Sequence, residues 1–263
     1  MKDTTIVITG GIRGIGRSIA EVFSKAGGSV VAIDINEDLG VAVEQELRQI
    51  GYDFTFVRGD LSVRGEASEV IRKIFQDSGK IDVLVNNART QDKAGLDEET
   101  EEDWDMTMAV MLRAPFFASR EVIHCMKETD THGSIINIAS ILSRFVIKQA
   151  PAYHVAKAGV VQLTRYLAMQ AAPHGIRVNS ISPGFILQEE HRTLFEGPGN
   201  IKYRATAIGS IPLGRVGTAD EIAKTAFYLA SPESSFITGQ DIIVDGGSTI
   251  REHLDLLQER ELR

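Results

Sequence analysis

Short runs of apolar, β-branched residues alternate along this chain with longer amphipathic segments. The short runs predict strands at residues 4–9, 29–34, 53–57, 81–86, 133–139, 176–181 and 240–245. The longer segments predict helices at residues 15–26, 37–50, 64–78, 101–127, 152–173 and 218–231. Strands that alternate with helices form βαβ units, in which helices cover both faces of a parallel sheet. We therefore expect a single α/β domain with a doubly wound parallel sheet of about seven strands.

Composition narrows the class of protein. The 263 residues, 43% of them hydrophobic, suit one domain with a sizeable core. A formal net charge of −8 argues against a nucleic-acid partner. The single cysteine, Cys125, excludes an intrachain disulfide and fits a reducing compartment. Because no signal-peptide pattern or membrane-length apolar run is present, we expect a cytoplasmic protein without a membrane partner.

The first predicted strand runs into a turn that contains Gly10, Gly14 and Gly16, and then into a helix. Glycines let the backbone approach a ligand closely, and the free N–H groups of a helix N-terminus favour anionic oxygens. This arrangement predicts a site for the diphosphate of a dinucleotide. The second strand ends in Asp34, which is placed to accept hydrogen bonds from ribose hydroxyls and would repel a 2′-phosphate.

A second group of polar residues suits proton transfer. Tyr153 and Lys157 lie four residues apart in a predicted helix and so point to the same side of it. An ammonium beside a phenol favours the phenolate and lowers a pKa that is ordinarily ~10. Ser140, at the end of a predicted strand, can hold a carbonyl oxygen while a proton moves to or from it. The pair alone also fits an ordinary polar helix face, so the surrounding motifs decide between the two interpretations.

Those motifs continue along the chain. Asp60–Leu61 follows the third strand, Asn86–Asn87–Ala88 the fourth, Pro183–Gly184 the sixth, and Asp245–Gly246–Gly247 the seventh. In order and spacing, across nearly the whole chain, the set resembles the short-chain dehydrogenase/reductase family in its main single-domain branch. The resemblance implies a Rossmann-like fold and an NAD(P)-dependent oxidoreductase that interconverts a secondary alcohol and a ketone by hydride transfer. It also implies a homotetramer or homodimer.

The resemblance assigns roles to individual residues. Tyr153 would be the general acid/base, Lys157 would lower its pKa and contact the nicotinamide ribose, and Ser140 would orient the reacting oxygen. The residues expected to bind the cofactor are Gly10, Ile12, Arg13, Gly14, Ile15, Gly16, Asp34, Ile35, Asp60, Leu61, Asn87, Ala88, Tyr153, Lys157, Pro183, Gly184 and Ile186.

The choice between NAD and NADP depends on two residues of opposite charge. Asp34 favours NAD, and it is followed by Ile35 and Asn36 rather than by a basic residue. Arg13, inside the glycine turn, could instead pair with a 2′-phosphate. We expect NAD, with NADP as the alternative.

Three residues depart from the family pattern. Met111 stands where the family has a catalytic asparagine, whose backbone carbonyl holds a water of the proton relay. Pro115, four residues on, has no N–H and therefore cannot bond to the Met111 carbonyl, which would remain available for that water. The alternative is a merely kinked helix in which Met111 fills the core. Arg89 replaces a glycine, and Gln188 replaces a hydroxyl residue that often follows Pro-Gly.

Arg89, Arg144 and Lys148 would all flank the mouth of the site in the family layout. In an acidic protein, three such cations suggest an anionic substrate, such as a carboxylate or phosphate. They could equally be three unrelated surface bases. The substrate is thus expected to be a small alcohol or ketone. Whether the substrate is anionic, and whether Gln188 contacts it, stay open at this point.

The expected organisation is a catalytic and dinucleotide-binding domain at residues 1–250 and a charged tail at residues 251–263. Residues 184–217 lack clear periodicity, and in the family the matching region is a lid over the substrate. No histidine has metal-ligand spacing with Cys125 or another histidine, so we expect no metal. The alternative to an enzyme is a cofactor-binding regulatory or scaffold protein of the same fold.

Overall fold

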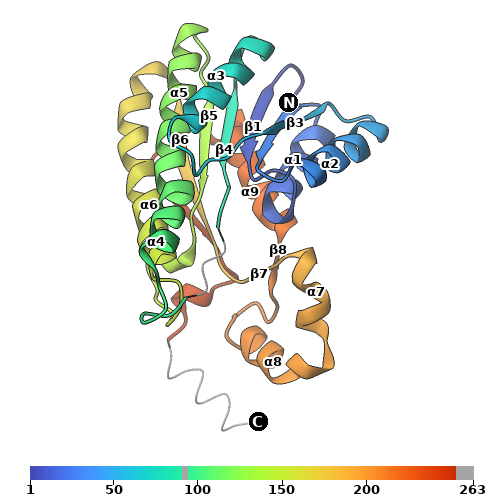
Figure 1. The fold of residues 1–263 in the computed structure, drawn as a ribbon, viewed down its shortest axis with the longest axis vertical. Helices are drawn as coiled ribbons and strands as arrows, with labels where there is room; N and C mark the ends of the chain where they lie inside the picture. The colour runs from blue at the N-terminus through green and yellow to red at the C-terminus, as the bar shows by residue number, and fades with distance from the viewer. Residues whose placement is uncertain (91–93, 253–263) are drawn as a thin grey trace.

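The computed structural model describes residues 1–90 and 94–252, which build a layered α/β structure (Figure 1). Within them, seven parallel strands form one sheet in the order β3-β2-β1-β4-β5-β6-β9. The strands are β1 (Thr5–Thr9), β2 (Ser29–Asp34), β3 (Phe54–Arg58), β4 (Val83–Asn86), β5 (Ser134–Ile138), β6 (Arg177–Pro183) and β9 (Asp241–Val244). The chain winds outward in both directions from β1 and β4, and the predicted Rossmann-like, doubly wound fold is confirmed.

Helices cover both faces of this sheet (Figure 1). One face carries α1 (Gly14–Lys25), α2 (Glu37–Gln49) and α9 (Ala219–Ala230). The other carries α3 (Glu66–Ser78), α4 (Glu101–Met108), α5 (Ala114–Glu128) and α6 (Pro151–Ala171). Short 3₁₀ turns are η2 (Ile141–Ser143), η3 (Ala172–His174), η4 (Pro198–Asn200), η5 (Pro232–Ser234) and η6 (Ser248–Ile250).

Successive residues of one strand pack on opposite faces of the sheet. Ile6 and Ile8 pack toward α1 and α9, whereas Val7 between them packs toward α3 and α5. All three side chains are fully buried. Because both faces are covered, these strands are continuous apolar runs rather than alternating ones, and such runs are recognisable in the sequence.

The segment predicted as one helix at residues 101–127 contains a different turn in its middle. Residues Ala109–Arg113 form a π-helical turn, η1, between α4 and α5, and the N–H of Ala114 donates to the carbonyl of Ala109, five residues back. Pro115 follows at once and has no N–H to donate to Met111. A π turn shifts the hydrogen-bond ladder by one residue, so the proline is accommodated without breaking the helix.

Residues 184–217 contain helices that the sequence did not predict. A small ladder joins β7 (Ile186–Leu187) to β8 (Gly217–Thr218), and α7 (Glu189–Glu196) and α8 (Ile201–Gly209) lie between them. In Figure 1 these two helices stand beyond the carboxyl end of the sheet, away from its helical layers. Phe185, Phe195 and Tyr203 pack together with ring centroids 5.6–6.3 Å apart. These three aromatic rings form a small core within residues 184–217.

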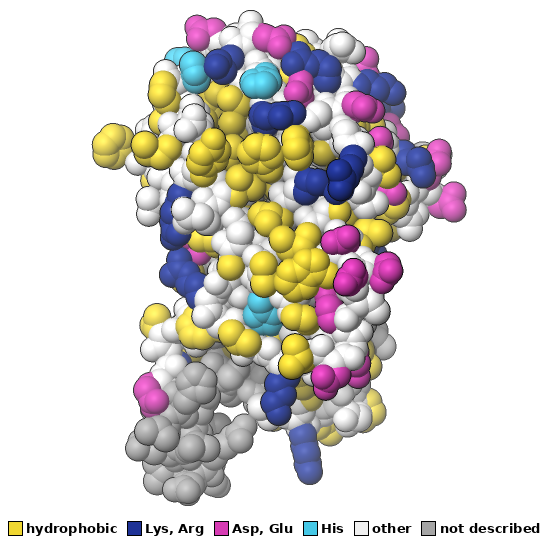
Figure 2. Space-filling view, turned by 60° about the vertical axis from the view of Figure 1, so that its left-hand side comes forward, with side chains coloured by type: hydrophobic (Ala, Val, Ile, Leu, Met, Phe, Trp, Pro, Cys, Tyr) yellow, Lys and Arg dark blue, Asp and Glu magenta, His cyan; other side chains and the backbone are white. Residues whose placement is uncertain are grey.

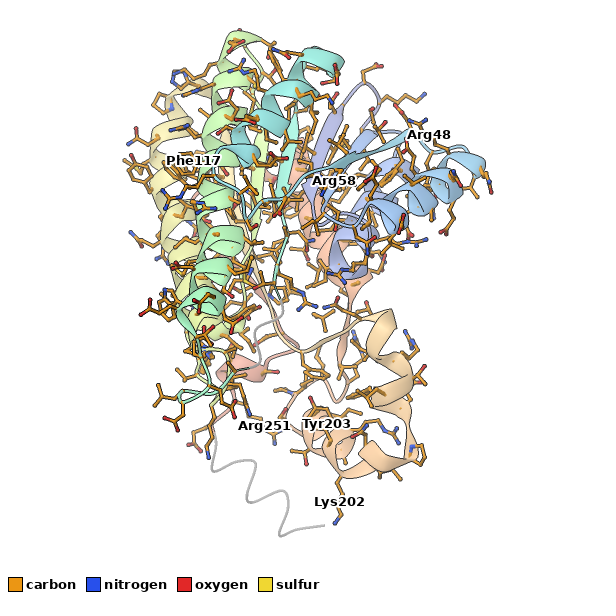
Figure 3. The ribbon with its side chains drawn as sticks, in the orientation of Figure 1. Arg48, Arg58, Phe117, Lys202, Tyr203 and Arg251 are labelled. Atoms are coloured by element: carbon orange, nitrogen blue, oxygen red, sulfur yellow. The ribbon has the colours of Figure 1, made fainter. Side chains whose placement is uncertain are left out.

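The chain beyond β9 contacts the segment at residues 184–217. The guanidinium of Arg251, a side chain labelled in Figure 3, donates a 2.8 Å hydrogen bond to the carbonyl of Gly209 at the end of α8. The remainder of the predicted tail, residues 253–263, lies outside the described residues. Of the helices in the described part of the chain, none combines the length and hydropathy that a membrane span requires.

Candidate functional site

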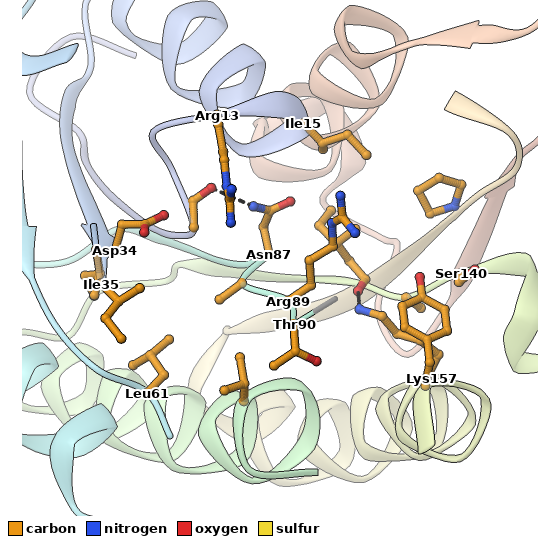
Figure 4. A pocket seen from close by; sticks show the side chains of 18 of the residues that line it. Arg13, Ile15, Asp34, Ile35, Leu61, Asn87, Arg89, Thr90, Ser140 and Lys157 are labelled. Carbon is orange, nitrogen blue, oxygen red and sulfur yellow. Dashed lines mark hydrogen bonds between the residues drawn. The ribbon is translucent and has the colours of Figure 1, made fainter. Parts of the chain in front are cut away.

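A pocket of about 370 Å³ lies along the carboxyl ends of the strands (Figure 4). Parallel α/β sheets bind their ligands at this edge. Most of the residues expected at the site line it: Gly10, Arg13, Ile15, Asp34, Ile35, Asp60, Leu61, Asn87, Ala88, Arg89, Ser140, Tyr153, Lys157, Pro183, Gly184, Ile186 and Gln188. The lining does not include Ile12, Gly14, Gly16, Met111, Arg144 or Lys148.

The turn between β1 and α1 is tight enough to require glycine. Gly10 and Gly14 have φ values of 67° and 53°, in the left-handed region that other residues rarely adopt. A Cβ on Gly16 would lie 2.0 Å from the carbonyl oxygen of Gly10. The turn brings the N-terminus of α1 against the pocket, where its N–H groups favour anionic oxygens. Ile12 is only 1% exposed and packs in the core, so its side chain faces away from the expected cofactor site.

Two carboxylates and one guanidinium occupy the end of the pocket near β2 and β3. Asp34 Oδ1 accepts a 3.1 Å hydrogen bond from the Asn36 N–H, and Asp60 Oδ1 accepts from the N–H and hydroxyl of Ser62 at 2.9 and 2.6 Å. These bonds fix the orientation of both carboxylates. Arg13 reaches the same end from the glycine turn (Figure 4). The opposing residues on which cofactor choice was expected to depend therefore line the same pocket.

Asn87 joins the turn after β4 to the turn after β1. Its side-chain amide donates to the carbonyls of Thr9 and Gly10 at 3.1 and 2.9 Å. The Thr9 hydroxyl in turn accepts from the N–H groups of Asn87 and Ala88 at 3.0 and 3.1 Å. Asn87 therefore lines the pocket while its amide nitrogen holds the wall together.

Ser140, Tyr153 and Lys157 converge at the other end of the pocket (Figure 4). Ser140 follows β5, and its Oγ accepts a 3.1 Å hydrogen bond from the Leu142 N–H, which leaves the hydroxyl proton to be donated. Tyr153 and Lys157 lie on the same side of α6, with Lys157 Nζ 5.5 Å from the centre of the Tyr153 ring. The Lys157 side chain is buried, with 3% exposed.

The surroundings of Tyr153 and Lys157 shift the pKa values of both side chains. Burial raises the pKa of Tyr153, while a hydrogen bond with Ser140 and the charge of Arg89 lower that pKa. Burial, followed by the Arg89 charge, lowers the pKa of Lys157 to about 7. In this structure Ser140 and Arg89 thus favour the phenolate of Tyr153. Lys157 is itself desolvated and holds its proton weakly.

The motifs Pro183–Gly184 and Asp245–Gly246–Gly247 pack against each other beside the pocket. A Cβ on Gly184 would lie 2.6 Å from Cβ of Asp245, so only glycine fits between the two segments. The Asp245 carboxylate accepts from the N–H groups of Gly247 and Thr249 at 2.9 and 2.7 Å, which fixes the turn after β9. These motifs, far apart in sequence, therefore form one wall.

The three cations expected at the mouth are separated in the structure. Arg89 lines the pocket. Arg144 instead forms a 3.0 Å ion pair with Asp241, whose side chain is 2% exposed and also accepts from two serine hydroxyls. Lys148 is exposed and lies outside the lining. The expectation of a cluster of three cations is therefore corrected to Arg89 alone.

The side chain of Met111 is buried, with 1% exposed, as the core-filling interpretation required. Its neighbours on α4 and the π turn, Met106 and Val110, line the pocket together with Thr90. These three residues were not predicted from the sequence. Thr90 lies two residues after the Asn-Asn-Ala motif, so its position was the available signal; Met106 lies on α4 and Val110 in the π turn.

The pocket suits an elongated cofactor with two different ends. Carboxylates that can bind ribose hydroxyls lie at one end, a glycine turn and helix N-terminus lie midway, and a buried lysine with a tyrosine lies at the other. The described residues contain no group of three or more histidine, cysteine or acidic side chains arranged to hold a metal.

Comparisons with known proteins agree with this arrangement. A family model described as enoyl-(acyl carrier protein) reductase matches residues 10–249. The 3-oxoacyl-(acyl-carrier-protein) reductase FabG of Chlamydia pneumoniae is 37% identical over 244 residues, which cover 93% of this chain and 96% of the relative. FabG of Thermotoga maritima is 38% identical over 251 residues, which cover 95% and 99%.

Solved structures give the same result. A gluconate 5-dehydrogenase from Burkholderia cenocepacia, in complex with NADP and tartrate, superposes with a TM-score of 0.87 at 31% identity, covering 96% of this chain and 97% of that one. A short-chain dehydrogenase/reductase from Serratia marcescens superposes with a TM-score of 0.85 at 29% identity, covering 94% and 98%. The chain therefore belongs to the short-chain dehydrogenase/reductase family of NAD(P)-dependent oxidoreductases.

Proposed function

We propose that this enzyme interconverts a secondary alcohol and a ketone, with Tyr153 as the general acid/base. The observation that supports this most is the convergence of Ser140, Tyr153 and Lys157 at one end of the pocket. A bound nicotinamide cofactor supplies the hydride chemistry, and the chain supplies orientation and the path of the proton.

Each of the three residues has a distinct task. The Ser140 hydroxyl donates a hydrogen bond to the reacting oxygen, because its proton is not used in the bond that its Oγ accepts from the Leu142 N–H. In the direction of reduction, the Tyr153 Oη–H bond breaks and its proton goes to the ketone oxygen; in oxidation the same proton returns to Tyr153. Lys157 would hold the ribose hydroxyls of a bound nicotinamide cofactor; after reduction one of its Nζ–H bonds gives a proton to Tyr153, and the amine regains a proton from water.

The proposed cofactor is NAD. Support comes from Asp34, which ends β2, lines the pocket and is held in place by the Asn36 N–H. A carboxylate there accepts from the ribose hydroxyls and repels a 2′-phosphate. The opposing support for NADP is Arg13 at the same end of the pocket, together with the NADP in the related gluconate 5-dehydrogenase.

The proposed substrates are small hydroxy or keto compounds, such as sugar derivatives, hydroxy acids or polyketide-like intermediates. Relatives named for 3-oxoacyl and gluconate chemistry support this range. The helices at residues 184–217 stand beside the pocket mouth, where Ile186 and Gln188 already line it, and we assign them the role of a substrate lid.

The proposed assembly is a homotetramer or homodimer. Figure 2 shows hydrophobic side chains gathered on the face that carries α5 and α6. On α6, Val155, Tyr166 and Met169 are 46%, 55% and 76% exposed. A second copy of the chain packed on this face would remove that apolar surface from water.

The decisive experiment is a turnover screen against a panel of secondary alcohols and ketones with NAD(H) and NADP(H), alongside fluorescence titration of the reduced cofactors. We expect turnover of at least one alcohol–ketone pair and tighter binding of NADH than of NADPH. Cofactor binding without any turnover would support the regulatory alternative, and preferred binding of NADPH would reverse the cofactor assignment.

A further inference from the structure

The two ends of the pocket carry opposite charges. The acidic residues of the described lining, Asp34 and Asp60, belong to the end near β2 and β3. Around Tyr153 the described charged lining residues are Arg89 and Lys157, both basic. The reacting end of the pocket is therefore cationic in a protein whose formal net charge is −8.

Arg89 is held in place on both sides. The N–H of Ala88 donates to the Thr9 hydroxyl at 3.1 Å, and the hydroxyls of Thr90 and Thr107 lie 3.0 Å apart in a hydrogen bond. The backbone of Arg89 is thus tied to β1 before it and to α4 after it. From this position its side chain extends into the pocket between Ile15 and the corner that holds Lys157 (Figure 4).

The charge of Arg89 acts on the reacting groups. It lowers the pKa of Tyr153 and that of Lys157, so the same guanidinium acts on both side chains. A substrate group at the same corner would experience the same field. A guanidinium binds carboxylate or phosphate oxygens through paired hydrogen bonds, and it does so most strongly where water is excluded.

We propose that Arg89 binds an acidic group of the substrate, which makes the substrates of this enzyme hydroxy acids and keto acids. The proposal rests on the alcohol–ketone function proposed above and narrows its substrate class. The other source of anionic oxygens is the cofactor diphosphate. We favour the substrate because the glycine turn and the N-terminus of α1 already provide a diphosphate site, whereas Arg89 acts on Tyr153 and Lys157.

The test uses two probes with the same carbon skeleton. Tartrate carries two carboxylates and threitol carries two alcohols in their place. Each is titrated by calorimetry into protein saturated with its preferred cofactor, so that no turnover is needed. The variants are Arg89→Gly, which restores the usual family residue, and Arg89→Lys, which keeps the charge. Lys148→Ala removes a cation outside the pocket lining and is the matched control.

We expect wild type to prefer tartrate. Arg89→Gly should lower tartrate affinity about 10- to 100-fold, the range for a lost hydrogen bond to a charged group, and leave threitol binding unchanged. Arg89→Lys should retain part of the preference, and Lys148→Ala should retain all of it. Wild type without a preference for tartrate, or an Arg89→Gly variant with the wild-type preference, would overturn the proposal.

The cofactor titration separates the two anion sources. If Arg89→Gly weakens NAD(H) binding and leaves the tartrate preference intact, Arg89 binds the diphosphate and the proposal is wrong. If the variant loses the tartrate preference while no alcohol or ketone is turned over, the acid site stands and the proposed reaction fails instead. Failure of the two proposals can therefore be told apart.

Discussion

Lys157 Nζ lies 2.6 Å from the carbonyl oxygen of Ile138 and donates a hydrogen bond to it. Ile138 is the last residue of β5, two positions before Ser140, and Lys157 lies one helical turn after Tyr153 on α6. This single bond therefore fixes the strand end that presents Ser140 against the helix that presents Tyr153. It also explains how a lysine is tolerated at 3% exposure, since at least one of its N–H donors has a partner.

The first prediction concerns Tyr153. Tyr153→Phe should lower kcat ~100- to 10,000-fold, the range of general acid–base contributions, because the ring remains and the transferable proton is lost. NADH binding, measured by fluorescence titration, should stay within about twofold, or under ~0.5 kcal/mol.

Tyr166 offers a matched control for this change. It lies on the same helix, is 55% exposed and does not line the pocket. Tyr166→Phe should have wild-type kcat. If Tyr153→Phe also retained kcat within about threefold, below the general acid–base range, Tyr153 would be excluded from the proton path.

The second prediction is a pH dependence of stability that arises from Lys157. Its pKa is about 7 in the folded protein and 10.5 for an ordinary exposed lysine, so between these pH values the unfolded chain binds more protons than the folded one. Stability of the cofactor-free protein should therefore rise with pH from about 7 toward 10. Lys157→Met should remove this rise, and Arg89→Gly should reduce it because one of the two causes of the shift is lost.

Urea unfolding at several pH values measures this slope. Lys148→Met, at an exposed lysine on the loop before α6, serves as the control and should keep the wild-type slope. Equal slopes for wild type and Lys157→Met would show that the buried lysine keeps an ordinary proton affinity.

The third prediction concerns the cofactor. Asp34→Ala should weaken NAD binding by the loss of a ribose acceptor and improve NADP binding by the loss of a repulsion. Adding Ile35→Arg should strengthen NADP further, because Ile35 lines the pocket beside Asp34 and is 55% exposed.

Kd values for the two cofactors, measured side by side, decide the outcome. Arg13→Ala is the informative counterpart, since Arg13 reaches the same end of the pocket. If wild type prefers NADP and Arg13→Ala abolishes that preference, Arg13 outweighs Asp34.

The sequence allowed most of the fold to be predicted, for a physical reason. Strands covered on both faces are nearly continuous apolar runs, and the functional residues follow them at the carboxyl ends. Ser140 after β5 and Asp34 at the end of β2 are examples. The helices α7 and α8 were missed because they pack on a few aromatic residues, such as Phe185 and Tyr203, and need no full apolar stripe.

Long-range pairing limited what could be predicted of the site. Arg144 lies close to Tyr153 in sequence, yet its ion-pair partner is Asp241, 97 residues away. No local sequence pattern predicts that ion pair. The low pKa of Lys157 likewise depends on how completely the fold buries it, a quantity that the Tyr–Lys spacing does not contain.

The last prediction concerns Met111 and Pro115. We expect the Met111 carbonyl to hold a water of the proton relay, because Pro115 cannot bond to it and Met111 lies within the π turn, which moves the hydrogen-bond ladder by one residue. If so, the asparagine side chain usual in the family adds little here. Met111→Asn should keep kcat near wild type or improve it modestly.

Pro115→Ala should have the opposite effect. The new N–H can close an ordinary helical bond to the Met111 carbonyl and remove the acceptor of the water. We expect kcat to fall about tenfold, as for the loss of one hydrogen bond of ~1.4 kcal/mol from the transition state. The melting temperature should stay the same or rise, because alanine is the better helix former. Lower activity with undiminished stability distinguishes a lost relay from a damaged fold, whereas full activity in Pro115→Ala would place the Met111 carbonyl outside the proton path.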